Sequence, residues 1–191
     1  MKLHIYLFRH GQTTFNRDKI FTGWKDAKLT KKGILDARKV AAKLKGKRID
    51  VAFCSHTSRS RDTLKEVLRF HPECKAIVVN DSIIERSYGK FAGKKHQTII
   101  DRYGQAEYDK WHRAYDYPPP GGESLRMVEE RVVKFIKYLI PFMKRGKFNV
   151  AISAHGNSMR PFRRYFEKMS IKEMTTLENP WDDYFEYDID A

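Results

Sequence analysis

The chain has 191 residues, 41% of them apolar and 13% aromatic, with a formal net charge of +14 at pH 7. Disordered chains are poor in aromatic residues, so we interpret residues 1–191 as one folded domain. No apolar run approaches the roughly 20 residues of a membrane-spanning helix, and no small-residue cleavage site follows "LHIYLF". We expect a cytoplasmic protein, a monomer or homodimer, with no membrane partner.

The positive charge indicates an anionic partner, which leaves nucleic acid, an anionic membrane surface or a small charged molecule. The basic residues are dispersed, the largest clusters "KLKGKR" and "RPFRR" are short, and no nucleic-acid-binding signature is present. We therefore expect a small anionic substrate and no nucleic acid. The segments "CSH" and "HPEC" lack the compact spacing of a zinc site, so no metal is expected.

Strand and helix patterns alternate along the chain. The pattern predicts strands over residues 2–8, 51–55, 75–79 and 149–154, and helices over residues 30–44, 58–70, 123–143 and 160–169. Thr30 is the expected N-cap of the first helix, and Pro161 is compatible only with the first turn of the last one. Alternation of this kind predicts an α/β fold with three layers, in which helices flank a mostly parallel central sheet.

Two of the predicted strands end in the same His-Gly unit. "LFRHG" places Arg9 and His10 at one strand end, and "AISAHG" places His155 at another. In open α/β sheets the functional crevice lies outside the carboxyl ends of the strands. A neutral imidazole is a nucleophile toward phosphorus, and guanidinium binds phosphate bidentately. A single histidine at a strand end is usually an ordinary partly exposed residue, but the repeated unit favours a phosphoryl-transfer site.

Three long motifs occur in a characteristic order: "RHGQTTFNRDKIFTGWKDAKLTKKG", "ERSYGKFAG" and "AHGNSMR". Together they resemble the histidine phosphatase superfamily, and specifically its branch of cofactor-dependent phosphoglycerate mutases. The similarity extends from residue 3 to about residue 170. It implies a parallel-sheet α/β fold and a phosphohistidine intermediate. It also implies phosphorylated substrates, which agrees with the positive charge.

The resemblance implies a catalytic set of five residues: Arg9, His10, Arg59, Glu85 and His155. In this set His10 becomes phosphorylated and Glu85 is the general acid and base, while the other three bind the phosphoryl oxygens. In "TSRSRDTL" the neighbouring Arg61 is an alternative to Arg59, although the spacing to the following Thr-Leu pair favours Arg59.

The resemblance also implies a set of substrate-binding residues: Thr13, Asn16, Thr22, Gly23, Arg86, Tyr88, Arg113, Gly156 and Asn157. Phosphatases of the superfamily usually lack "FTGW" and carry glycine at the position of Asn157, which favours a mutase. Three departures favour a phosphatase. His96 replaces a lysine of mutases, His112 replaces the first arginine of a pair, and "DYPPPGGESL" replaces a long insertion. The basic tail of mutases is also missing after Ala191.

We expect an enzyme that interconverts 3-phosphoglycerate and 2-phosphoglycerate through a phosphohistidine, with 2,3-bisphosphoglycerate as the phosphoryl primer. The alternative is a phosphomonoesterase of the same superfamily acting on small phosphorylated metabolites. A basic binding module without chemistry is a third possibility, against which the intact His10, Glu85 and His155 argue. The acidic stretch after Glu178 is the candidate lid, and its charge predicts a loosely closed site that releases some phosphate.

Overall fold

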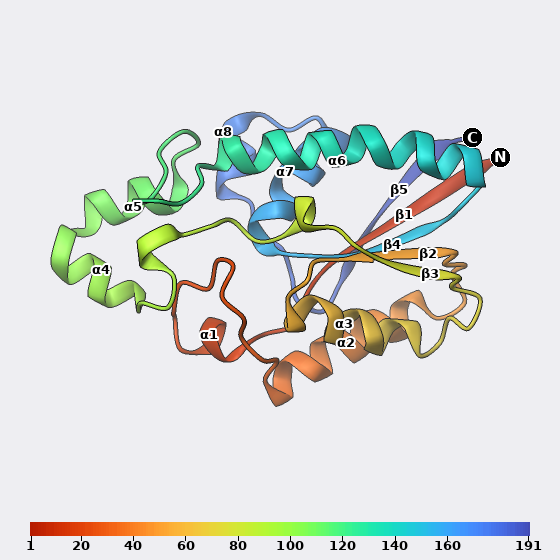
Figure 1. Cartoon of the computed structure of the whole chain (residues 1–191), viewed down its shortest axis with the longest axis horizontal. Helices are drawn as coiled ribbons and strands as arrows, with labels where there is room; N and C mark the ends of the chain where they lie inside the picture. Colours follow the sequence, from red (N-terminus) through yellow and green to blue (C-terminus); the bar gives the residue numbers. More distant parts are fainter.

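A computed structural model describes residues 1–191 (Figure 1). A five-stranded sheet with the strand order β3-β2-β4-β1-β5 forms its centre. The strands are β1 (Lys2–Arg9), β2 (Val51–Cys54), β3 (Ala76–Val79), β4 (Val150–Ala154) and β5 (Tyr184–Asp190). The first four strands run parallel, and β5 pairs antiparallel with β1 at the edge.

Helices cover both faces of this sheet. Figure 1 shows α6 (Leu125–Gly146) and α7 (Gly156–Glu167) above it, with α2 (Lys31–Leu44) and α3 (Ser58–Leu68) below it. Alternate side chains of β1 enter two different cores, because successive residues of a strand point to opposite faces. Leu3 and Ile5 pack with α6, whereas Tyr6 and Phe8 pack with α2 and α3. The predicted three-layer α/β fold is confirmed.

The remaining elements are short: α1 (Thr14–Arg17), η1 (Asp81–Ile83), η2 (Gly89–Phe91), α4 (His96–Tyr103), α5 (Gln105–Arg113) and α8 (Ile171–Thr176). In Figure 1, α4 and α5 form a lobe to one side of the sheet. This lobe has its own apolar cluster of Phe21, Tyr88, Phe91, Ile99, Tyr108 and Trp111. No helix is both long enough and apolar enough to cross a bilayer.

The predicted helices over residues 30–44, 58–70 and 123–143 are present with small shifts at their ends. Thr30 caps α2 as expected, since its side chain accepts a hydrogen bond from the Gly33 N–H at 3.0 Å. The prediction for Pro161 was wrong. Helix α7 begins at Gly156, so Pro161 lies in the second turn and offers no N–H to the Asn157 carbonyl.

The sequence pattern missed β5 and therefore misplaced the acidic end of the chain. Four acids there pair with lysines of β1, α2 and the segment after α2: Asp188 with Lys2, Asp182 with Lys39, Asp183 with Lys43 and Glu186 with Lys47. The predicted acidic lid is therefore wrong, because most of these residues cover the edge of β1 beside basic side chains. Only Glu178 and its neighbours lie at the cavity described below.

Candidate active site

The register of the central strands brings the two His-Gly units together. Arg9 at the end of β1 lies opposite Ala154 at the end of β4. The ladder continues one residue further, where the His10 N–H donates to the Ala154 carbonyl at 3.0 Å. As a result, the rings of His10 and His155 lie edge to face with their centroids 4.9 Å apart.

The hydrogen bonding of His10 leaves one of its ring nitrogens available as a nucleophile. Its Nδ1 lies 2.8 Å from the Gly11 carbonyl oxygen. Because a carbonyl oxygen only accepts, Nδ1 carries the proton and Nε2 keeps its lone pair. Burial, followed by the positive charges of Arg59 and Arg9, holds the pKa of His10 well below its ordinary value. The imidazole is therefore neutral at physiological pH.

Three side chains beside His10 each keep one buried nitrogen without a hydrogen-bond partner. These atoms are Arg9 Nε, Arg59 Nε and His155 Nδ1. Other nitrogens of the same side chains have partners in the protein. For example, Nε2 of His155 lies 2.8 Å from the Ser55 hydroxyl, which holds the ring in place. Buried polar atoms are rarely left unsatisfied, so these three indicate a site for a bound anion. We call Arg9, His10, Arg59 and His155 the phosphoryl site.

The structure distinguishes Arg59 from its neighbour Arg61. Arg59 is fully buried in α3, and its two terminal nitrogens donate to the carbonyls of Lys25 and Gly23, both at 2.8 Å. Gly23 adopts a left-handed φ of 54°, which aims its carbonyl at the guanidinium. Arg61 is exposed. Arg59 is thus the arginine of "SRSR" that faces the phosphoryl site.

Glu85 presents one carboxylate oxygen to the cavity. Its Oε1 accepts hydrogen bonds from the backbone N–H groups of Arg86 and Asn157, at 2.8 and 3.0 Å. Its Oε2 has no protein partner, and the residue is 8% exposed. Two backbone donors therefore fix the carboxylate while leaving an oxygen that can exchange a proton with a bound ligand.

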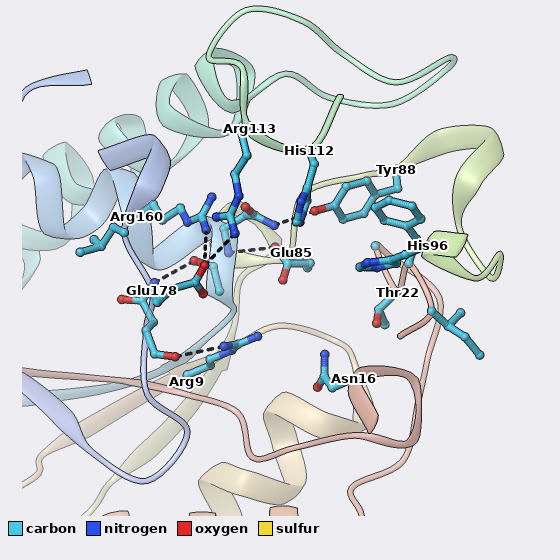
Figure 2. Close-up of a pocket in the computed structure, with 17 residues that line it drawn as sticks. Arg9, Asn16, Thr22, Glu85, Tyr88, His96, His112, Arg113, Arg160 and Glu178 are labelled. Carbon is cyan, nitrogen blue, oxygen red and sulfur yellow. Dashed lines mark hydrogen bonds and ion pairs between the residues drawn. The ribbon is translucent and has the colours of Figure 1, made fainter. Parts of the chain in front are cut away.

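A cavity of about 190 Å³ opens in front of the phosphoryl site (Figure 2). This size suits a small molecule. Besides Arg9 and Glu85, seven expected residues line it: Asn16, Thr22, Gly23, Tyr88, Arg113, Gly156 and Asn157. We call this lining, apart from Arg9 and Glu85, the outer cavity. His10, Arg59 and His155 lie buried behind it, where Gly156 fits closely because an added Cβ would lie 3.2 Å from Arg9.

Two residues expected to contact substrate do not line the cavity. Thr13 is fully buried, and its hydroxyl and N–H both bond to the Asn16 side chain as the cap of α1. Arg86 is also fully buried, and its guanidinium donates to the carbonyls of Glu123, His112 and Tyr117. Both residues support the cavity wall in this structure, because their polar atoms are already satisfied by the protein.

Eight further residues line the cavity: Ile20, Phe21, His96, His112, Arg160, Leu177, Glu178 and Asn179. For Arg160 a signal existed in the sequence, since it follows Gly156 by one helical turn within "AHGNSMR". The segment 177–179 carries no local motif. Its position depends on the path of the chain from α8 to β5.

The two histidines that replace basic residues of mutases make the wall near α4 and α5 neutral. His96 stacks on Phe21 with centroids 4.1 Å apart, and its Nδ1 lies 3.0 Å from the Tyr108 hydroxyl. Burial and Lys19 lower the pKa of His96. Burial, and after it the positive charge of Arg113, lowers the pKa of His112 to about 3. The remaining cations of the outer cavity are Arg113, beside His112 at the end of α5, and Arg160 on α7.

The phosphoryl site is poorly suited to a metal ion, because its imidazoles lie beside the positive charges of Arg9 and Arg59. One cluster elsewhere brings potential ligand atoms together, namely His4, Glu186 and Asp188 on β1 and β5. Its carboxylates already pair with Lys47 and Lys2. In the phosphoryl site, positive charge for an anion comes from the side chains of Arg9 and Arg59.

Fold and site together define an α/β enzyme whose anion-binding centre contains paired histidines at the carboxyl ends of parallel strands. Comparison with known proteins agrees, since the profile of the histidine phosphatase superfamily (branch 1) matches residues 5–184. The chain belongs to this superfamily.

Related sequences are named 2,3-bisphosphoglycerate-dependent phosphoglycerate mutase. The protein of Parvibaculum lavamentivorans is 38% identical over 177 residues, which is 91% of this chain and 84% of the relative. That of Methanococcus vannielii is 32% identical, covering 93% and 86%. A solved structure of alpha-ribazole phosphatase from Shigella flexneri has a TM-score of 0.84 at 22% identity, covering 98% and 91%. The solved structure of phosphoglycerate mutase from Bacillus anthracis has a TM-score of 0.77 at 20% identity, and the match covers 98% of this chain and 92% of that structure. At these identities both solved structures show similarity of fold alone.

Proposed function

We propose that the protein is a phosphoglycerate mutase that works through a phosphorylated His10 and interconverts 3-phosphoglycerate and 2-phosphoglycerate. The observation that supports the chemistry is the fixed tautomer of His10, whose Nε2 keeps its lone pair in a site where Arg9, Arg59 and His155 each keep one buried nitrogen without a partner. The names of the related sequences and the presence of Asn157 in the outer cavity support the choice of substrate.

The proposed transfer has two halves. With the phosphoryl oxygens on Arg9, Arg59 and His155, the His10 Nε2 lone pair forms a bond to phosphorus while the ester P–O bond breaks. Glu85 donates a proton to the leaving oxygen. This half loads His10 from 2,3-bisphosphoglycerate, which leaves as a monophosphoglycerate. In the second half Glu85 takes the proton from the free hydroxyl of bound 3-phosphoglycerate, the N–P bond to His10 breaks, and the phosphoryl group moves to that oxygen. The 2,3-bisphosphoglycerate so formed returns its other phosphoryl group to His10, and 2-phosphoglycerate leaves.

Phosphomonoesterase activity is the second candidate function, and the neutral His96 and His112 favour it. The rim of the outer cavity is open to water, since the side chains of Arg113 and Glu178 are 40% and 70% exposed. Water that reaches the phosphohistidine accepts the phosphoryl group in place of a hydroxyl. We therefore propose a mutase that also releases phosphate, with the open rim rather than an acidic lid as the cause.

The decisive assay supplies 3-phosphoglycerate with catalytic 2,3-bisphosphoglycerate and measures 2-phosphoglycerate and free phosphate together. We expect 2-phosphoglycerate to form faster than phosphate, with phosphate release readily detected. Phosphate release without any isomerisation, even in primed reactions, would show that the enzyme is a phosphatase.

A further inference from the structure

Glu85 borders the cavity (Figure 2), but no regular element carries it. It lies between η1 and η2, in the stretch of residues 84–88 that belongs to no helix or strand. Side chains on such stretches are placed less precisely than side chains on helices or strands. A general acid and base must lie within hydrogen-bond distance of the oxygen that it serves. The contacts of this stretch with the rest of the protein therefore decide where the carboxylate lies.

The backbone carbonyl of Glu85 accepts hydrogen bonds from two side chains that lie far away in the sequence. The indole N–H of Trp24 donates to it at 2.8 Å, and Nη2 of Arg131 donates to it at 3.0 Å. A carbonyl oxygen has two lone pairs, so both are used. Neither Trp24 nor Arg131 lines the cavity. Any effect of these two residues on a bound ligand therefore passes through Glu85.

Arg131 on α6 also holds the chain on both sides of Glu85. Its Nη1 donates to the Ile84 carbonyl at 2.9 Å. Its guanidinium pairs with the Glu123 carboxylate, at 2.9 Å through Nε and at 3.0 Å through Nη2. Glu123 in turn accepts a hydrogen bond from the Ser87 N–H at 2.8 Å. The side chains of Arg131 and Glu123 are 19% and 12% exposed, so water screens this pair little.

The contact of Trp24 connects Glu85 with the phosphoryl site. Trp24 follows Gly23, whose carbonyl accepts a hydrogen bond from Nη2 of Arg59 at 2.8 Å. Two consecutive residues thus hold an arginine of the phosphoryl site and the backbone of Glu85. Trp24 is itself 52% exposed. A substitution that removes only its N–H should therefore leave the packing of the core unchanged.

We propose that Trp24 and Arg131 are positioning residues for Glu85, and that their hydrogen bonds to its backbone carbonyl set where its carboxylate lies relative to the phosphoryl site. The proposal rests on the proposed function in so far as Glu85 protonates the leaving oxygen. The N–H groups of Arg86 and Asn157 hold the carboxylate itself. Loss of a donor to the carbonyl shifts the acid without touching the groups that bind the phosphoryl oxygens.

The test compares two phosphoryl donors that need the acid to different degrees. 2,3-Bisphosphoglycerate leaves through an alkoxide oxygen, which takes a proton from Glu85, whereas p-nitrophenyl phosphate releases a stable p-nitrophenolate without one. In both reactions the bond from His10 Nε2 to phosphorus forms and the ester P–O bond breaks. With enzyme in excess, acid-labile label on His10 and release of p-nitrophenolate measure this step, whichever acceptor later receives the phosphoryl group.

The variants should slow the two donors unequally. We expect Glu85→Gln to slow transfer from 2,3-bisphosphoglycerate about 1,000-fold, and transfer from p-nitrophenyl phosphate less than about five-fold. Trp24→Phe keeps the ring without the N–H, and should slow the first donor about five-fold and the second less than about two-fold. Arg131→Gln should slow the first donor about 30-fold and the second less than about three-fold, because it frees more of the stretch.

Arg126→Gln is the matched control. Arg126 lies on the same helix as Arg131, is exposed and pairs with surface acids, so its loss should change neither rate. Thermal melting shows whether Arg131→Gln folds. If it does not, Trp24→Phe decides the question alone, since Trp24 contributes little to the core.

The proposal is overturned if either variant, once folded, slows both donors by the same factor or slows neither, while Glu85→Gln separates them. If Glu85→Gln slows both donors equally, Glu85 is not the acid, and the proposed transfer fails together with the positioning role. A protein that forms no 2-phosphoglycerate but shows the expected difference between donors refutes the mutase and retains the positioning role.

Discussion

The phosphoryl site and the outer cavity are built in different ways. In the phosphoryl site His10, Arg59 and His155 are buried and Arg9 is partly buried. These residues lie at the ends of β1 and β4 or in α3, and short motifs reveal them. The outer cavity gathers side chains from the α4–α5 lobe, α7 and the segment before β5, and its rim residues Arg113 and Glu178 are exposed. The sheet thus fixes the position of His10, while less regular parts of the chain surround the outer cavity.

This difference separates chemistry from specificity. Changes in the phosphoryl site should abolish turnover, because its donors act on the transferred group itself. Changes in the outer cavity should mainly alter which ligand binds and which acceptor receives the phosphoryl group. Each prediction below tests one side of this division.

The largest effect should follow from His10→Ala in the phosphoryl site. Removing the imidazole eliminates the covalent route, so kcat should fall at least about 1,000-fold while thermal melting shows a folded protein. Acid-labile, base-stable labelling by a phosphorylated substrate should disappear. His56→Ala is the control, because His56 is exposed and paired with Asp81. Equal labelling of the wild type and His10→Ala would place the nucleophile elsewhere.

Arg59→Gln should combine a loss of rate with a shift in the pH profile. We expect kcat/KM to fall about 100-fold, because a donor to the phosphoryl oxygens is lost. The positive charge of Arg59 lowers the pKa of His10. Its removal should therefore raise that pKa and move the acid limb of the kcat/KM profile to higher pH. Arg61→Gln, at the exposed neighbour, should change neither quantity. An unmoved acid limb in Arg59→Gln would show that Arg59 does not act on His10.

His112→Gln tests whether the wall of the outer cavity is neutral. The folded protein holds the pKa of His112 at about 3, below the unfolded value of about 6.5. Below pH 6.5 the unfolded chain binds a proton at His112 that the folded protein does not, so stability falls as pH falls. Between pH 7.5 and 5.5 this histidine should cost about 1.4 kcal/mol of unfolding free energy, which His112→Gln should recover. Urea denaturation at both pH values measures the difference, and an unchanged pH dependence would show that folding does not lower the pKa of His112.

Asn157→Gly should alter partitioning more than rate. The substitution removes the hydrogen bond from Asn157 Nδ2 to the Tyr88 hydroxyl at 3.1 Å and keeps the backbone N–H that holds Glu85. We expect the ratio of free phosphate to 2-phosphoglycerate to rise about three-fold, because a contact to the glycerate is lost while the phosphoryl site is intact. Tyr88→Phe should act in the same direction but less strongly. A proportional loss of both products would instead place Asn157 in the chemical step.

The smallest expected effect is that of metal removal. Because Arg9 and Arg59 supply the positive charge, activity should be unchanged in excess chelator, measured with and without added Zn²⁺ or Mn²⁺. Loss of activity in chelator that a metal ion restores would contradict the side-chain-based phosphoryl site.

The sequence was sufficient for the layers of the fold and for the residues of the phosphoryl site. Alternating strand and helix patterns predict the parallel sheet, because the periodicity of buried residues is a local property. The His-Gly units and the motif around Arg59 mark residues whose places at strand ends and on α3 follow from that topology. Strand β5 was not predicted although apolar and acidic residues alternate strictly over residues 185–190. Its acids suggest a lid in the sequence, and only the structure shows that their partners are lysines elsewhere in the chain.

Only the tertiary structure decided how the outer cavity is completed. In the structure Thr13 and Arg86 support the wall of the cavity and do not line it. The Thr13 hydroxyl bonds to the Asn16 side chain, and Arg86 donates to the carbonyl of Glu123, 37 positions later in the chain. The tertiary structure also brought Glu178 to Arg113, 65 positions earlier in the chain. A motif records the residues that act at one strand end or on one helix. The rim of a cavity depends instead on how separate segments pack against one another, and no local pattern encodes that packing.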